Sequence, residues 1–111
     1  MKINFITKKL QKIFNSEKKM LKEYGVSQTK KIKMRMKVLE SAVNLAEVPT
    51  QKPDRRHKLK GNRKKQFAVD ILHPYRLLFK PEGDPLLLPD GGIDIKQVTC
   101  IIILGVEDYH D

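Results

Sequence analysis

The chain has 111 residues, with 23 Lys and Arg against 13 Asp and Glu, which gives a formal net charge of +10. At this length we expect one domain over residues 1–111, because about 100 to 150 residues can bury roughly two thirds of their surface around one core. A single Cys excludes a disulfide framework within the chain, and no apolar run approaches the roughly 20 residues that span a bilayer. These features predict a soluble, cytoplasmic protein that needs no membrane and seeks a polyanion or an acidic partner.

The first predicted elements are a strand and a helical hairpin. Residues 1–6 mostly alternate apolar and polar side chains, as a short strand does. Thr7 can cap a helix, and Gly25 ends it because glycine readily adopts the left-handed conformation behind a helix C-terminus. A second, antiparallel helix is predicted from near Ser27 to Pro49. Its apolar stripe consists of Ile32, Met36, Leu39, Val43 and Ala46.

An antiparallel meander is predicted after a polar connector at residues 50–56. The apolar period changes to two from His57 onward, and residues 65–72 and 75–79 read as neighbouring strands. Phe67, Val69 and Ile71 form one face of the first of these strands. The nearly continuous apolar run at residues 98–106 is typical of a strand in the interior of a sheet.

Residues 81–97 separate the last two predicted strands. They contain three Pro, three Gly and four acidic side chains, which indicates an enlarged hairpin or loop that leaves the sheet. The predicted fold is therefore α+β, in the order β-α-α-β-β-β. The N-terminal strand and the helical hairpin pack on a small antiparallel sheet, and residues 81–97, hereafter the excursion, are inserted before the last strand.

The charge is unevenly distributed along the chain. Residues 1–37 carry 12 basic and 2 acidic side chains, and residues 50–80 carry 10 basic and 2 acidic ones. Residues 81–111 carry 1 basic and 7 acidic side chains. The first two stretches suit RNA phosphates, whereas the acidic final part suits them only near its last residues.

Ionisable side chains gather at the predicted strand ends. Alternate strand ends of an antiparallel meander meet at one edge, so groups far apart in sequence can converge there. The chemistry that such a set suits is RNA cleavage, in which the 2′-OH attacks the adjacent phosphorus. Histidine can move the protons near neutral pH, and arginine can stabilise the phosphoryl oxygens. The residues concerned are His57, Tyr75, Arg76, Asp108, Tyr109 and His110.

This chemistry needs no metal, because the 2′-OH itself supplies the nucleophile. No zinc-ligand spacing, phosphate-binding Gly-rich loop or nucleophile elbow is present either, so we expect no metal and no cofactor. Cys100 lies within an apolar run and is expected to be a small buried side chain.

A plainer interpretation of the same residues is a basic edge that attracts the RNA backbone without cleaving it. The residues of this edge are Lys58, Lys60, Arg63, Lys64 and Lys65. From the residues alone, an enzyme and a passive RNA-binding protein both stay open.

Three ordered motifs carry a family resemblance. The stretch from His57 fits the pattern H-x-L-x-G-x-R, the predicted strand from Tyr75 contains R-L-L-F, and the chain ends in D-Y-H before its last residue. Together, over about residues 1–80 and 98–111, the chain resembles HigB-type toxins of the RelE/ParE superfamily. The resemblance implies the same β-α-α-β-β-β fold and a ribosome-dependent mRNA interferase. Such an enzyme cleaves mRNA in the A site of the 70S ribosome and leaves a 2′,3′-cyclic phosphate.

The same resemblance implies roles for single residues. His57 would be an active-site histidine, Arg76 would stabilise the phosphate, and Lys60 and Arg63 would hold mRNA or ribosomal RNA. A C-terminal cluster would complete the site with Asp108, Tyr109 and His110. We assign deprotonation of the 2′-OH to His110 or Asp108 and protonation of the leaving group to His57.

The resemblance also implies partners, and two alternative functions stay open. The partners would be a cognate HigA-like antitoxin with a helix-turn-helix domain, and operator DNA only through that antitoxin. One rival is a ParE-like inhibitor of DNA gyrase on the same fold, against which His57 and the D-Y-H ending argue. The other is the non-catalytic RNA- or ribosome-binding protein. The excursion departs from the short hairpin usual in this family. Three alternatives stay open for it: its Leu86-Leu87-Leu88 run packs on the sheet, the run binds a partner, or the excursion is an enlarged hairpin with no role.

Overall fold

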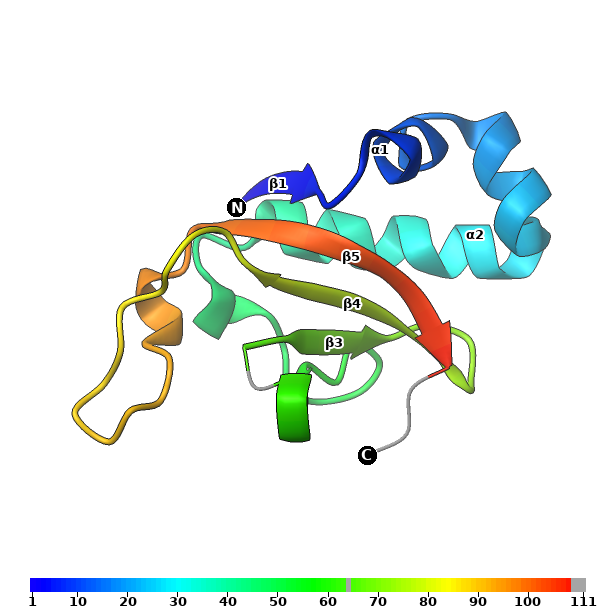
Figure 1. The fold of residues 1–111 in the computed structure, drawn as a ribbon. Coiled ribbons are helices and arrows are strands. Elements are labelled where there is room, and N and C mark those ends of the chain that lie inside the picture. Colours follow the sequence, from blue (N-terminus) through cyan, green and yellow to red (C-terminus); the bar gives the residue numbers. More distant parts are fainter. Residues whose placement is uncertain (64, 109–111) are drawn as a thin grey trace.

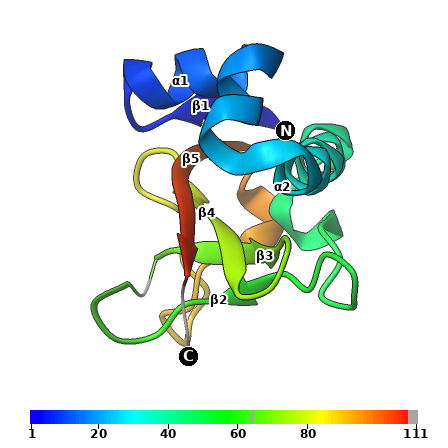
Figure 2. The same ribbon diagram turned by 90° about the vertical axis from the view of Figure 1, so that its right-hand side faces the viewer.

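The computed structural model describes residues 1–63 and 65–108. Within this range five strands form one sheet in the order β1-β5-β4-β3-β2, with β1 and β2 at opposite edges (Figures 1 and 2). The strands are β1 (Lys2–Phe5), β2 (His57–Lys58), β3 (Phe67–Asp70), β4 (Tyr75–Pro81) and β5 (Cys100–Asp108). The predicted α+β architecture is thus confirmed.

The sheet is mixed, which corrects the prediction that it is antiparallel. β2, β3, β4 and β5 pair antiparallel in the predicted meander, but β1 pairs parallel to β5, with Lys2 opposite Cys100 and Phe5 opposite Ile103. The meander sets the direction of β5, whereas the helical crossover sets the direction of β1. A long crossover can return the chain in either direction, so local patterns did not determine this pairing.

The helical region differs from the prediction in its boundaries. The first helix is interrupted: α1 (Lys8–Phe14) is capped by Thr7, and α2 (Glu17–Ser41) is capped by Ser16, whose side chain accepts from the Lys19 amide at 3.2 Å. Gly25 (φ 79°) breaks the helical geometry inside α2, as predicted. Among the described residues no helix is both long enough and apolar enough to cross a bilayer.

The second helical stripe holds only as far as Leu39. The helix ends at Ser41, eight residues before Pro49, and Val43 is 68% exposed. A 3₁₀ turn, Leu45–Glu47 (η1), places Leu45 in the core instead. Asn44 starts this turn by accepting a hydrogen bond from the Ala46 amide, and this local side-chain bond competes with helix continuation.

The main core lies between α2 and one face of the sheet. Phe67, Val69 and Ile71 are buried on this face, as the period of two predicted. Ile32 and Leu39 of α2 are fully buried against the same cluster. Because successive strand residues point to opposite sides, the residues between these core positions lie on the other face of the sheet, called the open face below.

The excursion leaves the sheet after β4, as predicted, and forms a small hairpin of its own. Leu87 and Ile93 make an isolated antiparallel bridge, and a 3₁₀ turn, Ile95–Gln97 (η3), leads back toward β5. Ile93 and Val98 are buried and anchor the base of this hairpin. The side chains of Leu86, Leu87 and Leu88 are 65%, 58% and 44% exposed, so this run does not pack on the sheet.

Cys100 differs from its prediction as a buried apolar side chain. It is only partly buried, and its thiol donates a hydrogen bond to Glu82 Oε2 at 2.6 Å. Burial raises the pKa of the Cys100 thiol, and its hydrogen bond to Glu82 and the charge of that carboxylate raise it further. The thiol is therefore a polar anchor in its protonated form.

Candidate functional site

The open face carries two of the predicted site residues, His57 of β2 and Arg76 of β4. Its small apolar centre consists of Leu59, Ala68 and Leu78, with Leu104 packed against it. Around this centre the alternation of β3, β4 and β5 places polar side chains, among them Asp70, Arg76 and Glu107. No described helix longer than a 3₁₀ turn packs on this face.

His57 lies on the edge strand β2 and pairs with Ala68, so the two residues share the open face. Its Nδ1 is 2.9 Å from the carbonyl oxygen of Arg55. A carbonyl can only accept, so Nδ1 carries the proton in this contact, and the Nε2 atom on the other side of the ring is buried. The backbone of the preceding connector thereby sets the tautomer.

Arg76 lies on β4 directly opposite Asp70 of β3. Its Nε is 3.0 Å from Asp70 Oδ1, and its Nη1 donates to the carbonyl oxygen of Pro74 at 3.0 Å. The Arg76 side chain is 14% exposed, so the guanidinium is largely shielded from water and fixed in orientation. This arrangement gives the open face a permanent cation whose position does not depend on a ligand.

Two further ion pairs extend this arrangement to both sides. Arg55 donates to both oxygens of Asp70, at 2.7 and 3.1 Å, and Arg63 Nη2 donates to Glu107 Oε1 at 2.9 Å. Glu107 is the cross-strand partner of Arg76 on β5. Five side chains of alternating sign thus cross the open face, in the order Arg55, Asp70, Arg76, Glu107 and Arg63. We call them the charge row; its net charge is positive.

Of the charge row, Arg63 and Arg76 were predicted from the sequence, whereas Arg55, Asp70 and Glu107 were not. Asp70 and Glu107 are acids within strands, where a solvated side chain is the usual outcome. One signal was available. Asp70 and Arg76 stand three residues on either side of His73 in the turn, which places them opposite each other in a hairpin.

The structure brings His57, Arg63 and Arg76 to one face but does not place all the predicted residues there. From strand spacing and register, the Cα atoms of His57 and Arg76 are about 12 Å apart, two strands and two residues away from each other. Asp108 is exposed at the end of β5, opposite Tyr75, and alternation directs it away from Glu107. Tyr109, His110 and Lys64 lie outside the described residues.

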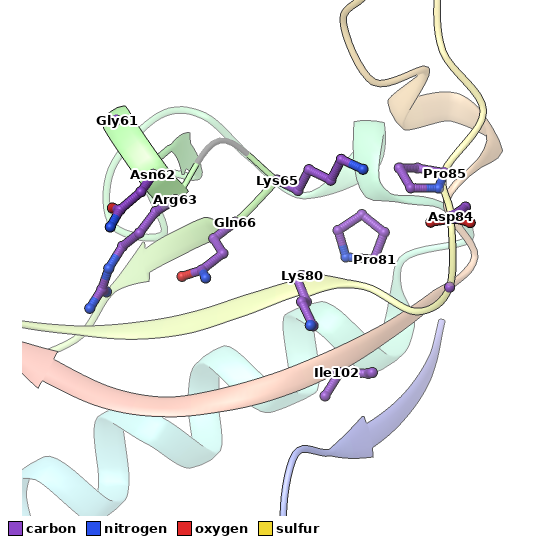
Figure 3. A pocket seen from close by; sticks show the side chains of 11 residues that line it. Gly61, Asn62, Arg63, Lys65, Gln66, Lys80, Pro81, Asp84, Pro85 and Ile102 are labelled. Carbon is purple, nitrogen blue, oxygen red and sulfur yellow. The ribbon is translucent and has the colours of Figure 1, made fainter.

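The other described lysines that were predicted to bind RNA flank the 3₁₀ turn Gly61–Arg63. Lys58, Lys60 and Lys65 are exposed. Lys65 and Arg63 also line a cavity of about 600 Å³ on the open face, together with Lys80 of β4 (Figure 3). Within residues 1–63 and 65–108, no three His, Cys, Asp or Glu side chains lie close enough together to hold a metal ion.

Arg56 completes the list of arginines near β2 and is structural in its contacts. Its Nε donates to the carbonyl oxygen of Val48 at 3.0 Å, and burial lowers the pKa of its guanidinium. The group stays charged, because the pKa of arginine lies far above neutral pH. It ties the connector to the end of η1.

Among known proteins, a solved structure has a similar fold. No protein-family model matches the sequence, and no curated protein matches it. The structure is similar to the solved YoeB-YefM complex from Staphylococcus aureus, with a TM-score of 0.57 and 16% sequence identity, over 100% of this chain and 98% of that chain. The chain therefore has a RelE/YoeB-like fold.

Proposed function

We propose that the chain is the toxin of a type II toxin-antitoxin system and acts in the cytoplasm as a ribosome-dependent mRNA interferase. Arg76 carries this proposal: a fixed, permanently charged guanidinium lies on the same face as His57 and Arg63. The RelE/YoeB-like fold supports it, as do the motifs that resemble HigB-type toxins.

The proposed reaction begins with attack of the RNA 2′-OH on the adjacent phosphorus. The 2′-OH loses its proton, the bond to the 5′-oxygen breaks, and that oxygen gains a proton. Arg76 stabilises the negative charge on the phosphoryl oxygens, and His57 protonates the leaving oxygen from Nε2. Asp108, Tyr109 and His110 contribute by resemblance, with His110 or Asp108 taking the proton from the 2′-OH. The products are a 2′,3′-cyclic phosphate and a 5′-hydroxyl end, without a metal.

The proposed partners follow from charge and from the fold neighbour. The basic side chains of residues 1–37 and 50–80 suit mRNA and ribosomal RNA of the 70S ribosome. The YoeB chain in the neighbouring structure is held in a complex with YefM, which supports a protein partner here too. We propose a HigA-like helix-turn-helix antitoxin, through which alone the chain would reach operator DNA.

A second candidate function has one observation in its favour. Asp70 already neutralises part of the charge of Arg76, so the arginine also has a structural role, as an ion pair between β3 and β4. On this ground the chain would be a non-catalytic RNA- or ribosome-binding protein.

Mapping mRNA 5′ ends separates the two candidates. The wild type and Arg76→Ala are expressed from a repressible promoter, with Lys37→Ala as an exposed control far from the open face. We expect new 5′ ends in phase with codons for the wild type and the control, and a loss of about 10²- to 10³-fold for Arg76→Ala. Growth arrest by the wild type without new cleavage sites would reject the nuclease. Unchanged ribosome binding by Arg76→Ala would then favour the passive binder.

A further inference from the structure

The cavity on the open face lies beside the charge row and is built partly by the excursion. It has a volume of about 600 Å³, within the range of small-ligand sites. It lies between the 3₁₀ turn Gly61–Arg63 (η2) and the first residues of the excursion, over the end of β4 (Figure 3). One wall therefore comes from the segment that sets this chain apart from the HigB pattern.

The lining of this cavity combines three kinds of chemistry. Arg63, Lys65 and Lys80 contribute positive charge. Pro81, Pro85 and Ile102 contribute apolar surface, against which a flat ring can pack. Among the described lining residues Asp84 is the one carboxylate, and Figure 3 shows it on the wall opposite Arg63.

This combination fits a nucleotide. Phosphate oxygens pair with lysine and arginine, and an unstacked base packs on apolar surface while its edge is read by polar side chains. A carboxylate accepts two parallel hydrogen bonds where two N–H donors lie side by side. Guanine offers such a pair on its Watson–Crick edge, N1–H and the exocyclic amino group. Adenine, cytosine and uracil do not.

We propose that this cavity binds a guanosine nucleotide of single-stranded RNA, with Asp84 on the guanine edge and Lys80 on the phosphate. The proposal rests on the proposed function, because it assigns the cavity to the same RNA. The path is continuous: Arg63 lines the cavity and also pairs with Glu107, the neighbour of Arg76. Lys80 and Arg76 lie on one face of β4, about 13 Å apart along the strand. RNA with its scissile phosphate at Arg76 would thus bring a neighbouring nucleotide to the cavity.

The excursion wall is anchored before any ligand binds. The Glu82 amide donates to the carbonyl oxygen of Cys100 at 3.0 Å, which extends the ladder between β4 and β5. The Glu82 carboxylate also accepts from Asn4 Nδ2 at 2.8 Å and from the Cys100 thiol. Asp84 follows two residues later, so its backbone starts from a fixed point. A preformed wall lowers the entropic cost of binding.

The test is binding of single nucleotides to the intact chain. The probes are the 5′-monophosphates of guanosine, adenosine, cytidine and uridine, titrated into isotope-labelled protein and followed by amide chemical shifts. We expect guanosine monophosphate to bind about tenfold more tightly than the others, as one well-made charged hydrogen-bond pair allows. The largest shifts should fall on Lys65, Lys80 and Ile102.

Two variants and two matched controls sharpen this test. Lys80→Ala should lower the affinity for each of the four nucleotides about tenfold. Asp84→Asn should bring the four affinities within about twofold of one another. Lys96→Ala and Asp94→Asn lie on the excursion outside the cavity and should change neither quantity. Variant spectra that keep the wild-type dispersion exclude misfolding as the cause.

The failures of the two proposals are distinguishable. No nucleotide binding, shifts that fall elsewhere, or affinities unchanged by Lys80→Ala would overturn the cavity proposal even if the chain cleaves mRNA on ribosomes. Equal affinities of the wild type for all four nucleotides would overturn the assignment of guanine. Guanosine-selective binding at the cavity without any cleavage would support the cavity and reject the nuclease.

Discussion

Arg55 donates two parallel hydrogen bonds to Asp70, from Nε to Oδ2 at 2.7 Å and from Nη2 to Oδ1 at 3.1 Å. The backbone of Arg55 adopts φ 47°, in the left-handed region that is unfavourable for a residue with a Cβ. This side-chain pair therefore offsets local backbone strain while it positions Asp70 against Arg76. The connector before β2 is thus coupled to the centre of the open face.

Substitutions of Arg55 should separate the ion pair from the backbone strain. Arg55→Ala loses the pair and keeps the strain, whereas Arg55→Gly loses the pair but relieves the strain. We expect Arg55→Gly to be more stable than Arg55→Ala by about 1 kcal/mol in the free energy of unfolding, measured with urea. Gln51→Gly, at an exposed position of the same connector, provides the control for chain flexibility. Equal stabilities of the two Arg55 variants would mean that this backbone conformation costs nothing.

Removing the negative charge of Glu107 should strengthen RNA binding. Glu107 pairs with Arg63 and lies opposite Arg76, so it reduces the positive potential that the open face offers to phosphates. Glu107→Gln should raise the affinity for single-stranded RNA severalfold and increase the slope of log K against log salt by up to about 0.7, the value for one added phosphate contact. This partly exposed pair contributes only about 0 to 1 kcal/mol to folding, so stability should change little.

Lys60→Ala provides the opposite change, because it removes a positive charge instead of a negative one. It should weaken RNA binding and lower the salt slope by a similar amount. If Glu107→Gln left both affinity and slope unchanged, RNA would not contact this part of the open face.

The periodic parts of this fold were predictable because their signals are local. Phe67, Val69 and Ile71 form the core face of β3 because a half-buried strand alternates. Gly25 breaks the helix because its backbone enters the left-handed region. The interruption near Ser16 was missed because the apolar positions keep a helical spacing across it. The cap that starts α2 competes with continuation of the first helix at little cost.

Only some of the residues on the open face were predictable from the sequence, and the contacts between them were not. His57 and Arg76 were found through motifs, and alternation then puts both on the open face. Their connection runs through Arg55 and Asp70, 15 residues apart in the chain. A pairing at that separation depends on the tertiary path of the connector, on which local periodicity carries no information.

Arg35 should be far more important for stability than its charge suggests. It occupies the apolar stripe of α2, between Ile32 and Leu39, and its side chain is 5% exposed. Its Nε donates to the carbonyl oxygen of Asp70 at 2.6 Å and lies 3.7 Å from the buried carboxylate of Asp54. Arg35→Met keeps the apolar stem but leaves the Asp54 charge uncompensated. We expect a loss of about 3 to 5 kcal/mol in the free energy of unfolding, measured by chemical denaturation.

Adding Asp54→Asn to Arg35→Met tests the cause of this loss. The double variant should recover part of the stability, because a neutral amide is less costly to bury than an unpaired carboxylate. A double variant that is no more stable than Arg35→Met would place the loss in the hydrogen bond to Asp70 instead.

The thiol of Cys100 should react slowly at neutral pH and should report on the excursion wall. Thiolate is the reactive form, and burial, the hydrogen bond to Glu82 and the charge of that carboxylate all raise the pKa of this thiol. In the native chain the rate of alkylation by iodoacetamide should therefore rise with pH and inflect above the ordinary value for cysteine, about 8.5. Glu82→Gln removes the negative charge, so its inflection should move down. The urea-unfolded chain, which lacks these contacts, should show the ordinary profile. A native inflection at or below that of the unfolded chain would mean that Glu82 does not hold the thiol, and the anchored wall beside Asp84 would lose its support.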